Sequence, residues 1–313
     1  MGRPFRLQIL MTLGAVPFVF LVFAARPKQQ QSELIIRSEA RLVLLDVSVT
    51  NHEGGHVSGL AQSAFSVFEN GKLQQITVFA NEDRPVTVGI IVDESYSMTP
   101  KRNDILSAAE TFIQASNPYD EMFVLNFNDT VKHGLPPQIP FSDDIRQLRS
   151  ALQRGLPQGK TALYDAVVDG LKQLEQGRRE KKALIVISDG GDNASFHKRS
   201  EMLDMVEKSI ATIYSIGLFS PGDPDRNPGI LKKLARISGG EAYFPDDPSE
   251  MLPVCRRIAK DIRARYTIGY VPLPRNGTVR DIRVHVSAPA YPRLSVHTRT
   301  SYHYEPIEKQ ETN

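Results

Sequence analysis

Residues 86–97 read VTVGIIVDESYS, and residues 183–191 read ALIVISDGG. Each segment opens with a continuous apolar run of strand length, which is typical of a strand buried on both faces. Each run ends in polar residues, Asp93 in the first segment and Ser188-Asp189 in the second. Strands of this kind belong to parallel sheets that helices cover on both sides. The two segments therefore predict an α/β fold with a doubly wound, mostly parallel sheet.

The same alternation of buried strands and amphipathic helices extends over residues 85–264, which we interpret as one domain. The expected strands are residues 86–92, 122–127, 183–187 and 212–218, with short strands at 130–135 and 242–244. The expected helices lie near residues 103–113, 145–152, 163–174, 202–209, 230–237 and 248–263. Asn103 or Asp104 is the expected N-cap of the first helix, because both residue types cap helices well.

The flanks of this domain have the two-residue alternation of half-buried strands. Residues 42–49 read LVLLDVSV, residues 66–79 place Asn70-Gly71 between two strand-like runs, and residues 266–302 return to alternation. Asn-Gly between such runs is a strong hairpin signal. Each flank is too short to be stable alone. We therefore expect a β segment at 33–84 to pair with one at 265–304, which adds a small β domain built from both flanks and leaves a tail at 305–313.

The first 25 residues resemble an export signal. Arg3 and Arg6 precede an apolar run from Leu7 to Ala25, after which polar residues return. This order is typical of a secretory signal peptide with cleavage after Ala24, although the run is also close to the length of a membrane anchor. We expect an exported protein, whether secreted, periplasmic or associated with the cell envelope, and both the cleaved and the anchored forms stay open.

Composition excludes several functional classes. The chain has 38 Lys and Arg against 36 Asp and Glu, a formal charge of +2, which is far from the basic surface that nucleic acid binding needs. It has one cysteine, Cys255, and so cannot form an internal disulfide, a cysteine-based zinc cluster or a redox pair. Any metal must be held by oxygen or imidazole ligands.

Oxygen-bearing side chains follow the predicted strands at the points where ligands collect in open α/β sheets. Asp93, Ser95 and Ser97 alternate in one loop, Thr161 opens a predicted helix, and Asp189 ends the second quoted strand. Two carboxylates and three hydroxyls suit Mg²⁺ or Mn²⁺, which prefer oxygen ligands in octahedral geometry. With two carboxylates the ion is only just neutralised, so a free position should attract a carboxylate from outside. No residue of the set is an obvious general base, which favours binding over catalysis.

Three motifs together resemble the von Willebrand factor type A domain and its metal ion-dependent adhesion site. They are Asp93-x-Ser95-x-Ser97, the run GKTALYD at residues 159–165, and the run SDGGDN at residues 188–193. The resemblance implies a Mg²⁺ ion held by Ser95, Ser97 and Thr161, with Asp93 and Asp189 binding directly or through water. Many members have glycine at the positions of Tyr96 and Lys160.

The flanks resemble a second, related family, the exported bacterial proteins named for Acidobacteria. The residues that carry this likeness are VSVT at 47–50, GHVSGL at 55–60, FSVFENGK at 65–72, and the elements Tyr266-x-x-Gly269-Tyr270 and Arg280-x-Ile282-x-Val284. This resemblance implies an architecture and no ligand.

The sequence leaves three hypotheses about function open. The first is an exported, non-enzymatic module that captures an Asp or Glu of a partner protein through Mg²⁺. The second is a Mg²⁺-dependent phosphatase-like hydrolase, since a metal at a strand end also serves phosphoryl transfer. The third is a structural domain with a vestigial site.

Other motifs have simpler interpretations. Residues 52–56 read HEGGH, but the zinc-protease pattern works only on a helix, and two adjacent glycines between strands favour a turn. The P-loop-like residues 155–161 are one residue short and follow a helix. Residues 222–225 resemble a surface loop more than a calcium site, Asp165 is a candidate second-layer residue behind Thr161, and Cys255 is expected to be a small buried hydrophobe.

Overall fold

A computed structural model describes residues 42–219, 222, 225–273 and 279–304, all within the unit Ala40–Asn313. The expected export segment and the tail from residue 305 lie outside these residues. No helix in the described part of the chain is both long and apolar enough to span a membrane.

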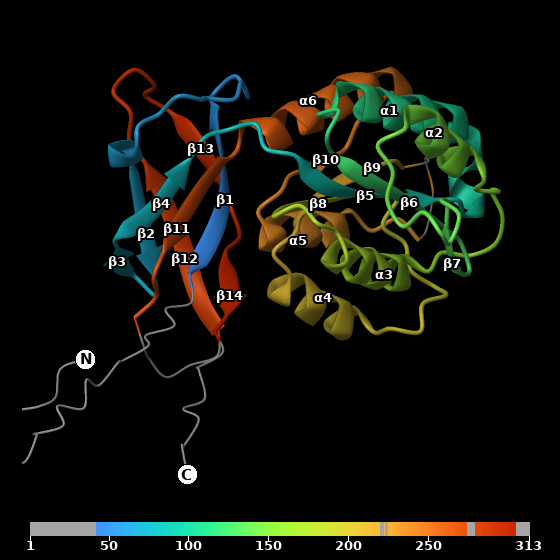
Figure 1. Ribbon diagram of the computed structural model, residues 1–313. Coiled ribbons are helices and arrows are strands. Elements are labelled where there is room, and N and C mark those ends of the chain that lie inside the picture. Colours follow the sequence, from blue (N-terminus) through green and yellow to red (C-terminus); the bar gives the residue numbers. More distant parts are fainter. Residues whose placement is uncertain (1–41, 220–221, 223–224, 274–278, 305–313) are drawn as a thin grey trace, which may run out of the picture. The chain divides into compact units, whose positions relative to one another are not determined.

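A six-stranded sheet forms the centre of the larger domain (Figure 1). Its strands stand in the order β10-β9-β8-β5-β6-β7, and all pairs are parallel except β6 with β7. The bounds are β5 Val86–Asp93, β6 Glu121–Phe127, β7 Val131–His133, β8 Lys181–Ser188, β9 Thr212–Gly217 and β10 Ala242–Tyr243. The two central strands are apolar along most of their length because helices cover both of their faces.

Six helices form the two outer layers of this domain. Figure 1 shows α1, α2 and α6 on one face of the sheet and α3, α4 and α5 on the other. Their bounds are α1 Arg102–Ala115, α2 Ile145–Gln153, α3 Leu163–Glu175, α4 Arg199–Lys208, α5 Pro228–Ser238 and α6 Met251–Ala264, and short 3-10 helices span Gln62–Ala64, Tyr96–Lys101 and Pro248–Glu250. This arrangement confirms the predicted doubly wound α/β fold class.

The expected N-cap of α1 is wrong. Asn103 and Asp104 lie inside the helix, which begins at Arg102 directly after the 3-10 helix Tyr96–Lys101. The helix start is set by a contact between distant loops, because the Arg102 side chain donates to Glu94 Oε2 at 3.1 Å and to the carbonyl of Gly155 at 2.6 Å.

The flanks form two four-stranded antiparallel sheets, ordered β13-β1-β11-β4 and β14-β12-β2-β3. The bounds are β1 Val43–Asn51, β2 Phe65–Glu69, β3 Lys72–Gln74, β4 Ile76–Ala80, β11 Tyr266–Tyr270, β12 Val279–Val286, β13 Leu294–His297 and β14 Ser301–His303. Asn70 and Gly71 both have positive φ, 47° and 74°, as a two-residue type I′ hairpin between β2 and β3 requires. Strands from both flanks pair with each other in each sheet, as predicted for a small β domain built from both flanks. The exact domain boundaries stay a prediction.

One buried carboxylate joins the two flanks inside this sandwich. Glu69 of β2 accepts hydrogen bonds from Arg280 at 2.6 Å, from the Tyr270 hydroxyl at 2.9 Å and from the Tyr302 hydroxyl at 2.7 Å. The three donors all come from the C-terminal flank, and Glu69 and Arg280 are almost completely buried. Removing Glu69 would take from Arg280 its buried carboxylate partner, which is destabilising.

A second buried network connects the sandwich to the α/β domain. Asp261 of α6 accepts hydrogen bonds from Ser48 of β1 and, at 2.5 Å, from Tyr214 of β9, and it pairs with Arg265 at 3.2 Å. Burial alone would raise the pKa of Asp261, but Arg265 and the neutral donors around it hold that pKa well below its usual range. Strand β9 and the end of α6 are therefore joined to β1 through buried polar groups.

We expect Glu69→Ala to lower the free energy of unfolding by about 3–5 kcal/mol, because Arg280 then stays buried without its carboxylate. Urea denaturation measures the change. Glu82→Ala is the matched control, since Glu82 is exposed and its pair with Arg84 should contribute at most about 1 kcal/mol. Equal effects of the two substitutions would contradict the role of Glu69.

Candidate metal centre

The parallel pairing of β5 with β8 places two polar strand ends side by side. Val92 stands opposite Ile187, so Asp93 and Ser188 follow as neighbours at the carboxyl edge of the sheet. The Ser188 hydroxyl donates to Asp93 Oδ2 at 2.6 Å and accepts the N–H of Gly190 at 3.0 Å. The β8 loop is thereby fixed against the end of β5.

The loop after β5 carries three of the predicted ligands in a compact turn. Asp93 Oδ1 accepts the N–H of Ser95 at 2.9 Å, a bond that closes an Asx turn. The hydroxyl oxygens of Ser95 and Ser97 lie 3.2 Å apart, and the Ser97 hydroxyl donates to Asp189 Oδ2 at 2.5 Å. Four of the five predicted residues thus form one continuous chain of contacts.

Thr161 lies in the loop before α3, and this loop is bonded to both of the other loops. Its N–H donates to Asn193 Oδ1 at 2.9 Å, its carbonyl accepts the N–H of Asn193 at 2.9 Å, and the N–H of Tyr96 donates to the carbonyl of Gly159 at 3.3 Å. Gly159 has φ of 76°, and a Cβ there would lie 1.7 Å from the Asp129 carboxylate. The positive φ favours glycine at this position, just before Thr161.

Burial dominates the electrostatics of Asp93. It raises the pKa of this carboxyl to about 7, and the negative charge of Asp189 adds to the effect, although hydrogen bonds from Ser188 and Ser95 oppose it. No basic side chain of the described residues forms an ion pair with Asp93. A buried carboxylate of this kind is stabilised by a nearby cation.

The donor set fits a small hard cation. Mg²⁺ binds oxygen at about 2.0–2.1 Å in octahedral geometry, which places neighbouring ligand oxygens about 2.9 Å apart. The Ser95–Ser97 and Ser97–Asp189 oxygen separations, 3.2 and 2.5 Å, lie on either side of this value. No cluster of three or more His, Cys, Asp or Glu side chains suited to a metal occurs among the described residues, so a centre here depends on hydroxyl ligands. The ligand set and the ion stay a prediction.

Several residues that support the loops were not assigned this role from the sequence. Ser188 holds Asp93, Asn193 holds Thr161, and the pair Glu94–Arg102 ties the β5 loop to the loop after α2. Asn193 and Ser188 stand inside a quoted motif, which is the only signal that could have identified them. Their partners are between 32 and 95 residues away in the chain, so no local pattern reveals the contacts.

Asp165 of α3 holds the segment between β8 and α4, and its expected role in a second layer behind Thr161 stays a prediction. Its carboxylate accepts the N–H groups of Phe196 and His197 at 2.8 and 2.9 Å and lies 2.6 Å from His197 Nδ1. These bonds hold the pKa of Asp165 below its usual range despite its partial burial.

The remaining motifs do not have the structural context that their patterns require. Residues 52–55 form a turn after β1, and His56 Nδ1 lies 3.1 Å from Asp261, so HEGGH is not helical. The P-loop-like residues follow α2 rather than a strand. Cys255 is buried on α6, which raises its pKa to about 12 and confirms it as a buried hydrophobe. Residues 223 and 224 of the possible calcium loop lie outside the described residues.

Residues 88–191 match the family model of the von Willebrand factor type A domain. The chain contains a von Willebrand factor type A domain. The match covers most of β5, all of β6 and β8, and the five predicted ligand residues. Among the curated proteins, none matches the chain.

Solved structures are similar to parts of the chain. A von Willebrand factor type A protein from Catenulispora acidiphila is 13% identical, with 85% of this chain and 74% of that chain covered and a TM-score of 0.51. BatB from Bacteroides thetaiotaomicron is 18% identical, with 56% and 98% covered and a TM-score of 0.44. The von Willebrand domain of the pilus tip protein Mfa5 from Porphyromonas gingivalis is 11% identical, with 58% and 96% covered and a TM-score of 0.47. The likeness to the Catenulispora acidiphila protein, at 13% identity, shows the fold alone.

We expect Ser188→Ala to lower the free energy of unfolding by about 1–3 kcal/mol, because the Gly190 N–H and the buried Asp93 carboxylate each lose a partner. Thermal or urea unfolding measures the loss. Ser107→Ala, on the exposed side of α1, is the matched control and should change stability by no more than about 0.5 kcal/mol. A loss no larger than that of the control would show that Ser188 does not hold the β8 loop.

Proposed function

We propose that this von Willebrand factor type A domain binds Mg²⁺ through Asp93, Ser95, Ser97, Thr161 and Asp189 and uses the ion to capture a carboxylate of a partner protein. The observation that carries the proposal is the continuous chain of hydrogen bonds from Asp93 through Ser95 and Ser97 to Asp189, across two neighbouring strand ends. The proposal describes an adhesion or assembly module, and it assigns no catalytic step. The expected export of the chain stays a prediction.

The charges of the ligands explain why an external acid would bind. Two carboxylates balance the two positive charges of the ion, and hydroxyl ligands add no charge. Five protein ligands leave one position of an octahedron, which Mg²⁺ commonly fills with water. An Asp or Glu side chain from a partner can replace that water and adds a charge-assisted bond that water does not supply.

The segments that carry the proposed ligands also carry exposed apolar side chains. Tyr96 is 73% exposed in the β5 loop, Leu156 is 66% exposed in the loop that leads to Thr161, and Phe196 is 93% exposed beyond Asn193. Aromatic residues at an interface commonly contribute most of its binding energy. Lys160 is also exposed in the Thr161 loop. We therefore propose a partner whose acidic residue is flanked by apolar side chains.

Asp93→Ala should weaken Mg²⁺ binding at least about tenfold, because the buried carboxylate at the end of β5 is lost. Isothermal titration of the full chain with MgCl₂ measures this. Asp169→Ala is the matched control, since Asp169 is a partly exposed aspartate on α3 whose nearest basic group, on Lys172, is 4.0 Å away. Equal Mg²⁺ affinity in all three proteins would rule out the centre and leave the domain a structural role.

Tyr96→Ser and Phe196→Ser should each reduce partner capture several-fold and leave Mg²⁺ affinity within about twofold, since neither side chain is a predicted ligand. An array of short peptides with a central Asp and varied flanking residues, incubated with MgCl₂ or EDTA, measures capture. Leu73→Ser, an exposed position on β3, is the control. Binding that is indifferent to Mg²⁺, or equal for Asp and Asn peptides, would contradict the proposed mode of recognition.

A further inference from the structure

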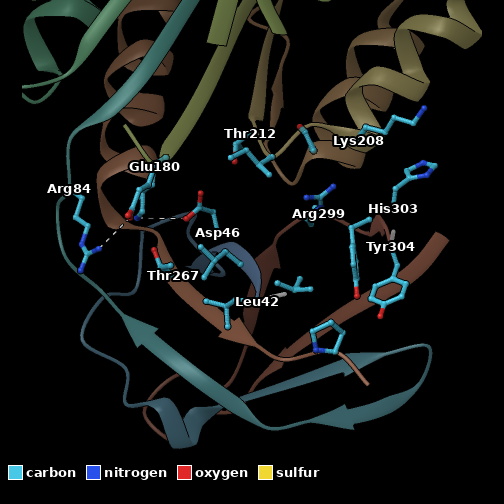
Figure 2. A pocket seen from close by; sticks show the side chains of 17 residues that line it. Leu42, Asp46, Arg84, Glu180, Lys208, Thr212, Thr267, Arg299, His303 and Tyr304 are labelled. Carbon is cyan, nitrogen blue, oxygen red and sulfur yellow. Dashed lines mark ion pairs between the residues drawn. The ribbon is translucent and has the colours of Figure 1, made fainter. Parts of the chain in front are cut away.

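A cavity of about 320 Å³ lies at the opposite edge of the central sheet from the candidate metal centre. Its lining includes Lys181 and Thr212, the first residues of β8 and β9, and Leu44 and Thr267 from β1 and β11. Figure 2 shows it from close by, with Leu42, Thr267 and Arg299 among the labelled side chains. The volume is at the lower end of the range of about 300–1,000 Å³ for small-molecule sites.

Large apolar side chains gather on this cavity. Leu42, Leu44 and Ile210 line it and are 43%, 47% and 61% exposed, respectively. Leu44 lies between Val43 and Leu45 in β1, and successive side chains of a strand point to opposite faces. Because Leu45 is fully buried, Leu44 faces away from the sandwich core. Apolar side chains that are grouped rather than scattered over a surface indicate a binding site.

The basic residues of the lining differ in their partners. Arg84 pairs with Glu180 at 3.6 Å, Lys181 with Asp46 at 3.7 Å, and Lys208 with Asp204 at 2.6 Å. His303 lies 3.9 Å from Glu207. Among the described residues, no carboxylate forms an ion pair with Arg299, so Arg299 is the basic group of the lining that can accept an added negative charge.

Backbone carbonyls hold the Arg299 guanidinium in place. Nε donates to the carbonyl of Ser301 at 2.8 Å, and Nη2 donates to the carbonyl of Glu207 at 2.7 Å. Burial lowers the pKa of Arg299, which is the direction expected for a cation whose charge is incompletely compensated. A carboxylate ligand would supply that compensation through charge-assisted hydrogen bonds.

We propose that this cavity binds a small amphiphilic carboxylate, with its hydrocarbon part against Leu42, Leu44 and Ile210 and its carboxylate at Arg299. The site is separate from the proposed Mg²⁺ centre, because the two lie at opposite ends of the parallel strands. Its occupation requires no metal.

Decanoate is a suitable probe because it joins a flexible hydrocarbon chain to one carboxylate, and decanol is the neutral control of equal chain length. Isothermal titration with the full chain, in the presence of EDTA, measures binding. Ile210→Glu places a negative charge in the apolar wall at an exposed position that should not affect folding, and Leu73→Glu is the matched exposed control outside the cavity. Arg299→Gln removes the cation.

We expect decanoate to bind with a Kd below about 1 mM and Ile210→Glu to weaken it at least about tenfold, while Leu73→Glu leaves it unchanged. Arg299→Gln should weaken decanoate about tenfold and decanol less than about twofold, as the loss of one charge-assisted bond predicts. The apolar residues 7–25 are present in every variant, so binding there would not respond to Ile210→Glu. Absence of decanoate binding, equal binding by Ile210→Glu, or equal affinity for decanoate and decanol would overturn the proposal.

Discussion

The register of β5 against β8 is the constraint on which the candidate site depends. It is fixed deep in the sheet, where Gly89 has no room for a side chain: a Cβ there would lie 2.4 Å from Phe123 and 2.7 Å from Leu184. A shift of either strand would bring side chains into this space. With the register fixed, Asp93 and Ser188 emerge as neighbours at the carboxyl edge, and the loops that follow need only short-range bonds to bring their oxygens together.

The flanking sandwich is held by a different kind of interaction, buried charged side chains that hydrogen-bond to several segments. Arg265 donates to the carbonyls of Asp46, Gly239 and His297 in addition to its pair with Asp261. These acceptors come from β1, from the end of α5 and from β13, so one side chain specifies how three segments meet. Such groups add little net stability compared with apolar packing, and their contribution is to fix one arrangement.

The parts of the fold that were predictable are those with local signals. Apolar runs identified β5 and β8, and Asn70-Gly71 identified its hairpin because few other pairs adopt positive φ at both positions. The start of α1 was not predictable, since it depends on Arg102 reaching Glu94 and Gly155. Glu69 also gave no signal: a glutamate in a strand is typical of an exposed face, and only three donors more than 200 residues away make its burial possible.

The two proposed sites recognise the same chemical group in different physical ways. At the carboxyl edge a divalent ion would be balanced by two buried carboxylates before any partner arrives, so the incoming acid binds through an open coordination position rather than through excess positive charge. At the amino edge Arg299 has no balancing carboxylate among the described residues, so there the acid would supply the missing charge itself. Chelation of the metal should therefore abolish binding at the carboxyl edge alone, because only that site depends on an ion. Added salt should weaken chiefly the contact at Arg299, because Arg299 is less buried than the two carboxylates of the metal centre.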